Sequence, residues 1–480
     1  MPVMTTLADI CAMLPGSQLI NISEAEARNF MLSTVGTDSR QVEPAELFIA
    51  LAGDRFDAHD YLVDVAKAGA GAALISKKEA CPAHLPAVCI ADTRLGLSVL
   101  AKAWRAKFSL PLVLVTGSNG KTTVKEMIAS IFKAAVGESH ALVTKGNLNN
   151  DIGLPLTLLC LRPAHHLAVI ELGMNHPGET AQLAHIAAAN IALINNAQRE
   201  HQEFMATVAA VAQEHADVLR ALPKDGIAIF PADSEFDSVW RTAAHGRQII
   251  DFALLSNGAM SQAAVTGRLL SNGQVQIETK QGSIEVQLKT MGNHNVRNAL
   301  AATAVALGAG VSLENIKVGL ETFIPVTGRM QAKNLDANHL LVDDSYNANP
   351  DSVRAAIDAL KQTTDFSWLV LGDMGEVGDQ GPAFHHEVGS YAAAQGVARL
   401  FALGEQSQKA VEGFKQTTKK FNLSSKAEHF ADVEKLNAAL LEVLQAEGGN
   451  TKLTILVKGS RFMRMERVAK ALLGEANTCS

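Results

Sequence analysis

The sequence has little positive charge and few aromatic side chains for its length. Its 42 Lys and Arg residues against 49 Asp and Glu residues give a net charge of −7 over 480 residues, so a general polyanion-binding surface is not supported. Aromatic residues make up only 5% of the chain, which argues against a stacking platform for single-stranded nucleic acid. Nucleic acid is therefore not an expected partner, and any phosphate must be bound locally.

Cysteine pairs and long apolar runs are missing as well. The five cysteines are odd in number and include no C-x-x-C pair, so neither a disulfide framework nor a zinc site is indicated. No run reaches the roughly 18 apolar residues of a membrane span, and no basic cluster precedes an apolar stretch near Met1. We therefore expect a cytoplasmic protein, monomeric and without membrane insertion.

The length and the apolar pattern predict three α/β domains. A chain of 480 residues exceeds what one hydrophobic core usually supports, and 48% of its residues are hydrophobic. Short apolar runs at 47–51 and 71–75 indicate a small α/β domain over 1–92. A central domain over 93–325 is expected to be a doubly wound parallel sheet. Its predicted strands lie at 112–115, 166–172, 191–195 and 226–230, with helices at 180–189 and 206–222.

The rest of the chain has two further patterns. Residues 262–290 alternate apolar and polar side chains around Gln281-Gly282, which predicts an antiparallel hairpin elaborating the edge of the central domain. Residues 326–480 predict a Rossmann-like C-terminal domain of alternating strands and helices. These elements are expected at 340–343, 351–362, 368–372, 385–395, 399–403, 433–445, 453–457 and 461–472.

A glycine turn between a buried strand and a helix is the strongest chemical signal. Such a loop directs backbone N–H groups and a helix dipole at phosphates, while Lys121 neutralises phosphate charge and the Thr122 hydroxyl can ligate Mg²⁺. Val115 stands where the general P-loop pattern has its first glycine, so this is a shortened variant. A chance Gly-Lys-Thr in a surface turn is the weaker alternative, because strand and helix are both present. The predicted ATP-binding residues are Thr116-Gly117-Ser118-Asn119-Gly120-Lys121-Thr122-Thr123.

This loop and the segments after it resemble the Mur ligase family, ATP-dependent enzymes that form amide bonds in peptidoglycan precursor synthesis. The run from Gly146 to Pro155 is similar to the family's asparagine-rich segment, which implies that Asn149 and Asn150 bind substrate. Glu171 ends an expected strand and by the family pattern holds Mg²⁺. His201 matches a histidine that helps to hold a second Mg²⁺, although a lone histidine is more often structural.

Two other segments resemble the family's nucleotide site. Asn295 and Asn298 match its H-N-x-x-N pattern, which implies that both lie near ATP. Capping of an expected helix over 297–308 is the alternative role for these two asparagines. Arg329 matches an arginine that reaches the phosphates from the third domain, where a guanidinium fork pairs well with phosphate oxygens.

The third domain resembles the family member that adds D-alanyl-D-alanine to a UDP-N-acetylmuramoyl-tripeptide. The resemblance rests on the runs 342–352 and 371–378, and the D-N-P-R motif of the diaminopimelate-adding member is absent from the sequence. It implies that Asp344 lies at the nucleotide and that Asn347 and Asn349 bind substrate.

Two segments outside the third domain bear on the same resemblance. In the first domain, Ser39 and Arg40 resemble the family's uridine-nucleotide-binding segment, which implies that they bind substrate. Several relatives also carbamylate a lysine that bridges the second Mg²⁺, and its place, counted from His201, contains no lysine. Either Glu214 or His215 supplies a substitute, or the second metal has fewer protein ligands.

The resemblance implies a reaction in two steps. The γ-phosphoryl group of ATP moves to the tripeptide carboxylate, and the amine of D-alanyl-D-alanine then attacks the acyl phosphate. Lys121, Glu171, His201 and Arg329 are the expected catalytic residues, acting through positioning and electrostatics with Mg²⁺. The alternatives are a sister amide ligase, folylpolyglutamate synthase included, and a non-enzymatic nucleotide switch, which would not need three domains.

Overall fold

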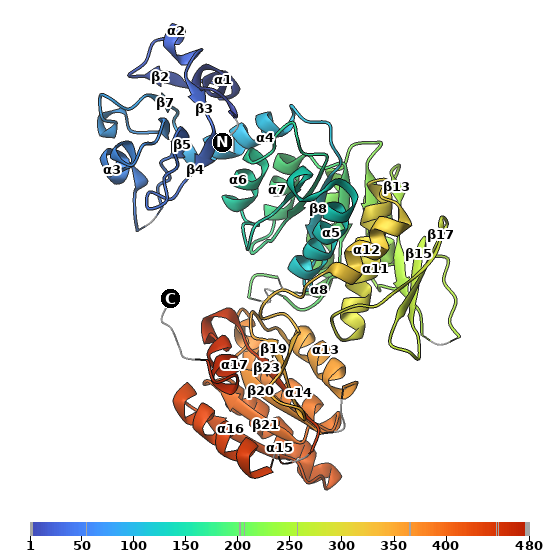
Figure 1. The fold of residues 1–480 in the computed structure, drawn as a ribbon. Coiled ribbons are helices and arrows are strands. Elements are labelled where there is room, and N and C mark those ends of the chain that lie inside the picture. Colours follow the sequence, from blue (N-terminus) through green and yellow to red (C-terminus); the bar gives the residue numbers. More distant parts are fainter. Residues whose placement is uncertain are drawn as a thin grey trace.

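The computed structural model describes residues 3–53, 55–200, 203–205, 207–256, 258–363, 366–447, 449 and 451–475. Figure 1 shows three lobes along an arc, with a cyan-to-yellow middle lobe between the other two. Each lobe combines β-sheet with helices, which confirms the expected α/β class. Within the described residues, no helix has both the length and the apolarity needed to cross a membrane.

The first lobe is built on a five-stranded sheet with the strand order β2-β7-β6-β5-β4. Its central strands β5 (Glu46–Ile49) and β6 (Ala72–Ile75) are buried along their whole length. Only β2 (Gln18–Ile20) pairs antiparallel to its neighbour in this sheet. The lobe also contains β1 (Thr5–Thr6), α1 (Leu7–Met13), α2 (Glu24–Ala27), β3 (Met31–Leu32), β4 (Thr34–Gly36), α3 (Leu62–Lys67) and β7 (Ala87–Cys89).

Helix α4 (Thr93–Arg105) joins the first lobe to the middle lobe. It packs on α1 and β6 on one side and on α6 (Gly153–Leu159) and α7 (Glu179–Ala187) on the other. Its buried Leu97 and Trp104 belong to one hydrophobic core that continues through both lobes. The domain boundary expected after residue 92 stays a prediction, because the helix that follows it, α4, packs against elements of both lobes.

The middle lobe contains a parallel six-stranded sheet in the order β13-β12-β11-β8-β10-β9. The central strands β8 (Leu112–Thr116), β10 (Leu167–Glu171) and β11 (Ile191–Ile194) are buried throughout, as expected where helices cover both faces. The expected helix over 206–222 is two helices, α8 (Val208–His215) and α9 (Asp217–Arg220). The remaining elements are α5 (Lys121–Val136), β9 (Ala141–Val143), β12 (Ile227–Ile229), α10 (Asp237–Ala243), β13 (Gln248–Ile249), α11 (Asn293–Gly308) and α12 (Leu313–Thr322).

The predicted hairpin is present but does not extend the edge of the parallel sheet. β16 (Val275–Thr279) and β17 (Gly282–Val286) pair antiparallel, and with β14 (Phe252–Leu254) and β15 (Val265–Leu269) they form a separate four-stranded sheet. The apolar side chains of this sheet pack against α11 and α12, in a core that they share with one face of the parallel strands.

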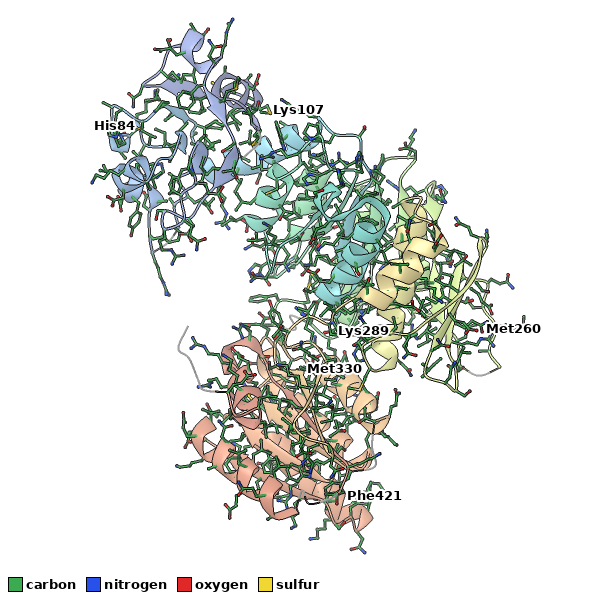
Figure 2. All side chains as sticks on the ribbon, viewed as in Figure 1. His84, Lys107, Met260, Lys289, Met330 and Phe421 are labelled. Atoms are coloured by element: carbon green, nitrogen blue, oxygen red, sulfur yellow. The ribbon has the colours of Figure 1, made fainter. Side chains whose placement is uncertain are left out.

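The third lobe has the sheet order β18-β19-β23-β20-β21-β22, in which only β18 (Gln331–Asn334) runs antiparallel. Helix α15 (Ser407–Phe421) and strand β22 (Lys426–Phe430) were not predicted from the sequence, and the last helix begins at Glu466, not at residue 461. Figure 2 shows Lys289 and Met330 where the middle and third lobes meet. The other elements are β19 (His339–Asp344), α13 (Pro350–Lys361), β20 (Ser367–Gly372), α14 (Gly381–Ala394), β21 (Arg399–Leu403), α16 (Val433–Glu447), β23 (Leu453–Lys458) and α17 (Glu466–Leu472).

Candidate functional site

A cavity of about 770 Å³ lies between the middle and third lobes, next to the carboxyl ends of β8, β10 and β11. Open α/β sheets bind ligands at this edge. His201 lies outside the described residues, and the described Ser39 and Arg40 belong to the first lobe and do not line the cavity. The predicted residues that do line it are Ser118, Asn119, Gly120, Lys121, Thr122, Thr123, Asn149, Asn150, Glu171, Asn295, Asn298, Arg329, Asp344, Asn347 and Asn349.

The P-loop connects β8 to α5 through two glycines with left-handed backbone angles. Gly117 has φ +137° and Gly120 has φ +78°, conformations that side chains other than glycine rarely adopt. A Cβ atom on Gly120 would lie 2.7 Å from Asn298 Oδ1 and 2.8 Å from Asn195 Nδ2. The shortened loop therefore needs Gly120 for its backbone angle and for the close approach of two asparagines.

Three asparagine side chains are linked by hydrogen bonds, and one of them, Asn195, contacts the backbone of the P-loop. Asn195 Nδ2 donates to the carbonyl of Asn119 and to Asn298 Oδ1, both at 2.9 Å, and Asn298 Nδ2 donates to Asn295 Oδ1 at 3.1 Å. Both predicted asparagines lie inside α11, whose N-cap is Gly292, so the capping alternative is wrong. Their contact with ATP stays a prediction.

Glu171 ends β10 inside the cavity, with its side chain 2% exposed. Its Oε1 accepts hydrogen bonds from Asn149 Nδ2 at 2.8 Å and from Thr122 Oγ1 at 3.2 Å. Its Oε2 is buried and accepts no hydrogen bond from any residue that the structure describes, and Lys125 Nζ lies 3.9 Å away. A buried carboxylate oxygen without a donor, beside a hydroxyl, is the kind of ligand that a hard divalent cation takes.

Few of the described side chains near Glu171 could ligate a metal ion. Among the described residues, no group of three or more His, Cys, Asp and Glu side chains could hold a metal ion. Glu171 and Thr122 fit one Mg²⁺ whose other ligands come from water or phosphate, as is common for this ion.

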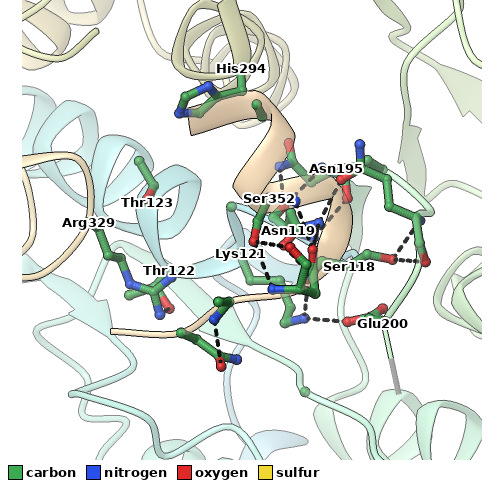
Figure 3. A pocket seen from close by; sticks show the side chains of 18 of the residues that line it. Ser118, Asn119, Lys121, Thr122, Thr123, Asn195, Glu200, His294, Arg329 and Ser352 are labelled. Atoms are coloured by element: carbon green, nitrogen blue, oxygen red, sulfur yellow. Dashed lines mark hydrogen bonds and ion pairs between the residues drawn. The ribbon is translucent and has the colours of Figure 1, made fainter. Parts of the chain in front are cut away.

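Lys121 points back over its own loop. Its Nζ donates to the carbonyls of Gly117 and Ser118 and to Glu200 Oε2 at 3.2 Å (Figure 3). Ser118 is held by Gln198, whose backbone N–H donates to the serine hydroxyl at 2.8 Å. The lysine therefore lies in the cavity with a defined orientation before any nucleotide is bound.

The third lobe contributes Arg329 to the same place. Its Nη2 donates to Thr122 Oγ1 at 3.0 Å, and its guanidinium carbon lies 4.1 Å from the centre of the Tyr346 ring. Its Nε is buried and has no acceptor within the described part of the chain. Figure 3 shows Arg329 beside Thr122, so the structure brings together the arginine and the P-loop predicted to share phosphates.

The other predicted third-lobe residues have partners within the protein. Asp344 accepts from the Met330 backbone at 3.1 Å and from Lys458 Nζ at 2.5 Å, so both of its oxygens are used. Asn349 is the N-cap of α13, and its Nδ2 donates to Asn119 Oδ1 in the P-loop at 2.9 Å. Asn347 lines the cavity, and its carbonyl accepts from Lys458. Their ligand contacts stay predictions.

The predicted substrate residues are divided between two places. Asn149 contacts Glu171, and Asn150 Oδ1 accepts from the Gly153 backbone at 2.8 Å at the start of α6. Arg40 is exposed and pairs with Asp38 at 2.8 Å. The Arg40 guanidinium lowers the pKa of Asp38 to about 2.

The two candidate substitutes for the missing lysine point in different directions. Glu214 accepts from the backbone N–H groups of Gly178 and Thr180, at the first turn of α7. His215 is fully buried and lies between Thr116 and Glu200. Both ring nitrogens of His215 therefore contact protein atoms.

Several cavity residues were not singled out from the sequence. Asn195, Asn196 and Glu200 follow β11, and a polar run after a buried parallel strand was the available signal. Lys458 is the last residue of β23, and Arg461 follows in the run Lys458-Gly459-Ser460-Arg461. The same strand-end rule that drew attention to Glu171 would have found them.

Comparison with known proteins identifies the family. Residues 32–107 match the description "Mur ligase family, catalytic domain", residues 115–306 "Mur ligase middle domain" and residues 328–461 "Mur ligase, glutamate ligase domain". The chain is similar to the UDP-N-acetylmuramoyl-tripeptide--D-alanyl-D-alanine ligase of Escherichia coli (strain K12), with 40% identity over 96% of this chain and 99% of that one. This chain belongs to the Mur ligase family.

Two further comparisons extend this relationship to the whole Mur ligase fold. The enzyme of the same name from Haemophilus influenzae is 38% identical over 95% of this chain and 97% of its own. A crystal structure of MurF from Acinetobacter baumannii superposes with a TM-score of 0.87 at 33% identity, covering 99% of this chain and 100% of that chain. The three-lobed arrangement is thus shared with that MurF structure.

Proposed function

We propose that this Mur ligase joins D-alanyl-D-alanine to UDP-N-acetylmuramoyl-tripeptide with the conversion of ATP to ADP and phosphate. The observation that carries the proposal is the meeting of the P-loop, Glu171 and Arg329 in one cavity. The full-length similarity to ligases of that name supports the choice of substrates. The proposal includes a monomer in the cytoplasm, and free cysteines such as Cys11 and Cys89 support that location.

ATP would bind with its phosphates over the P-loop and the first turn of α5. The backbone N–H groups there are directed at an anion, and Lys121 and Arg329 would neutralise charge on the transferred phosphoryl group. Thr122 and Glu171 are the residues that would hold Mg²⁺, which supplies charge stabilisation when bound. The predicted role of His201 as a second metal ligand is retained in this proposal.

Two bond exchanges would complete the reaction. A carboxylate oxygen of the tripeptide attacks the γ-phosphorus and ADP leaves, which turns a poor acyl donor into an acyl phosphate. The neutral amine of D-alanyl-D-alanine then attacks the carbonyl carbon, the carbon–oxygen bond to phosphate breaks, and the amine loses a proton. The side chains of both lobes contribute mainly positioning and exclusion of water.

A coupled assay of phosphate release tests the proposal. The protein should release phosphate with ATP, UDP-N-acetylmuramoyl-tripeptide and D-alanyl-D-alanine together, and not when any one of them is omitted. Single amino acids offered in place of the dipeptide serve as the control for a sister ligase. Release with an amino acid and not with the dipeptide would overturn the assignment of the substrate.

A further inference from the structure

A buried line of polar contacts connects the end of β8 to the P-loop lysine. His215 is the last residue of α8 and is fully buried. Its Nδ1 lies 3.2 Å from Thr116 Oγ1, and its Nε2 lies 2.9 Å from Glu200 Oε1. The other oxygen of Glu200 lies 3.2 Å from Lys121 Nζ. The line thus begins and ends on the two sides of the P-loop.

The chemistry of the groups fixes the direction of these contacts. A carboxylate only accepts hydrogen bonds, so Nε2 of His215 donates to Glu200 and Nζ of Lys121 donates to the other oxygen. The Glu200 side chain is only 5% exposed, and burial of a carboxylate is costly unless donors satisfy its oxygens. The histidine therefore helps to satisfy the buried carboxylate that lies beside Lys121.

We propose that His215 and Glu200 act as one positioning pair for Lys121, with His215 in the segment where several relatives have a carbamylated lysine. The proposal rests on the proposed function, in which Lys121 stabilises the transferred phosphoryl group. Glu214 is not the substitute, because its oxygens accept hydrogen bonds at the start of α7.

The pair has two consequences for catalysis. A lysine stem loses rotational freedom when it is fixed, and a partner that fixes it before ATP binds removes that cost from the reaction step. Glu200 also supplies a permanent carboxylate, whereas a carbamate forms only when a lysine reacts with CO₂. The rate should therefore be independent of dissolved CO₂.

Four variants of the full chain, together with His215→Gln as a rescue variant, test the pair. His215→Leu fills the space without a hydrogen-bond donor, and Glu200→Gln keeps the shape without the charge. The third variant combines both changes, and Glu214→Gln is the matched control one residue from His215. Calorimetric titration with ADP in the absence of Mg²⁺ counts folded nucleotide sites, and kcat is expressed per site.

Each single variant should lower kcat per site about tenfold or more, the usual effect of losing a group that orients a functional side chain. The double variant should be no slower than the slower single variant, because the two residues act as one unit. KM for the dipeptide should stay unchanged, and His215→Gln, whose amide can donate to Glu200, should regain part of the rate. The control should keep the wild-type kcat.

Three results would overturn the pair. These are additive losses in the double variant, an unchanged kcat per site in His215→Leu, and a carbamate carbon signal in the NMR spectrum of wild-type protein kept in ¹³C-bicarbonate. Wild-type protein that binds ADP but never releases phosphate with the dipeptide would instead refute the proposed function. The two failures are therefore distinguishable.

Discussion

Replacement of Arg199 by glutamine should weaken the contact between the middle and third lobes. Arg199 follows β11 in the middle lobe and bonds two carboxylates of the third lobe. Its Nη2 donates to Asp351 Oδ1 at 2.6 Å, and its Nη1 donates to Glu387 Oε2 at 2.8 Å. Its side chain is 19% exposed, and the guanidinium lowers the pKa of Glu387.

The size of the effect of Arg199→Gln depends on the interactions that Asp351 and Glu387 retain after the substitution. A hydrogen bond to a charged group contributes about 1.5–3 kcal/mol when it is well buried. Both carboxylates are partly exposed, and Glu387 retains Arg354 at 3.1 Å, so neither is left buried and unpaired. We therefore expect a net loss of about 2 kcal/mol, which lowers the ratio of closed to open molecules about 30-fold. If closure precedes chemistry, kcat/KM should fall by roughly 10- to 30-fold.

The assay combines phosphate release with small-angle X-ray scattering. Arg199→Gln should lower kcat/KM and increase the radius of gyration, and high salt should reproduce part of the effect in the wild type. Arg354→Gln is the control, because its bond to Glu387 lies within the third lobe. The reasoning is refuted if Arg199→Gln keeps both the wild-type rate and the wild-type scattering curve, or if the control has the same effect.

Four other predictions concern single residues. Lys121→Ala should lower kcat about 10²-fold or more with the fold intact, and a variant with wild-type ADP release would remove the lysine from the site. Glu171→Ala should lose activity that extra Mg²⁺ restores only in part; unchanged rates at limiting Mg²⁺ would make this carboxylate structural. Arg40→Ala should raise KM for the UDP-muramoyl peptide more than KM for ATP or the dipeptide, whereas equal changes would place Arg40 outside the site. Burial raises the pKa of Glu46 to about 7, so its contribution to the free energy of unfolding is fully present below about pH 4.5 and is lost as pH rises through 7. The contribution of Glu46 to the free energy of unfolding is at most about 3 kcal/mol, and solvent screening reduces it. In urea unfolding, the wild type should lose more stability than Glu46→Gln between pH 5 and 8. Equal losses in the two proteins would contradict this prediction.

The nucleotide half of the site was predictable because its signal is local. A buried strand, a glycine turn and a helix follow one another between Leu112 and Val136, and each is recognisable from its own residues. Glu171 was found for the same reason, since it ends a continuous apolar run. The α/β class and the hairpin also follow from patterns of a few residues.

The missed elements have weak local patterns or depend on tertiary contacts. β22 is a polar edge strand with one buried residue, so period-two alternation is faint. The sequence pattern over 206–222 predicts one continuous helix, and it does not indicate the break at Ala216. The pairing of His215 with Glu200 joins a helix end to a loop after β11, and only the packing of α8 on the sheet brings them together.

The segment after β11 is where the lobes and the P-loop meet. The side chains of Asn195 and Asn196 form hydrogen bonds with the backbone of the P-loop residue Asn119. These bonds fix the position of the segment relative to the loop. Arg199 bonds the third lobe, and the next residue, Glu200, bonds Lys121. Because adjacent residues are 3.8 Å apart along the backbone, a displacement of the third lobe that moves Arg199 must also displace Glu200 or strain the peptide between them. Closure of the lobes and orientation of Lys121 are thus coupled through the peptide bond between Arg199 and Glu200.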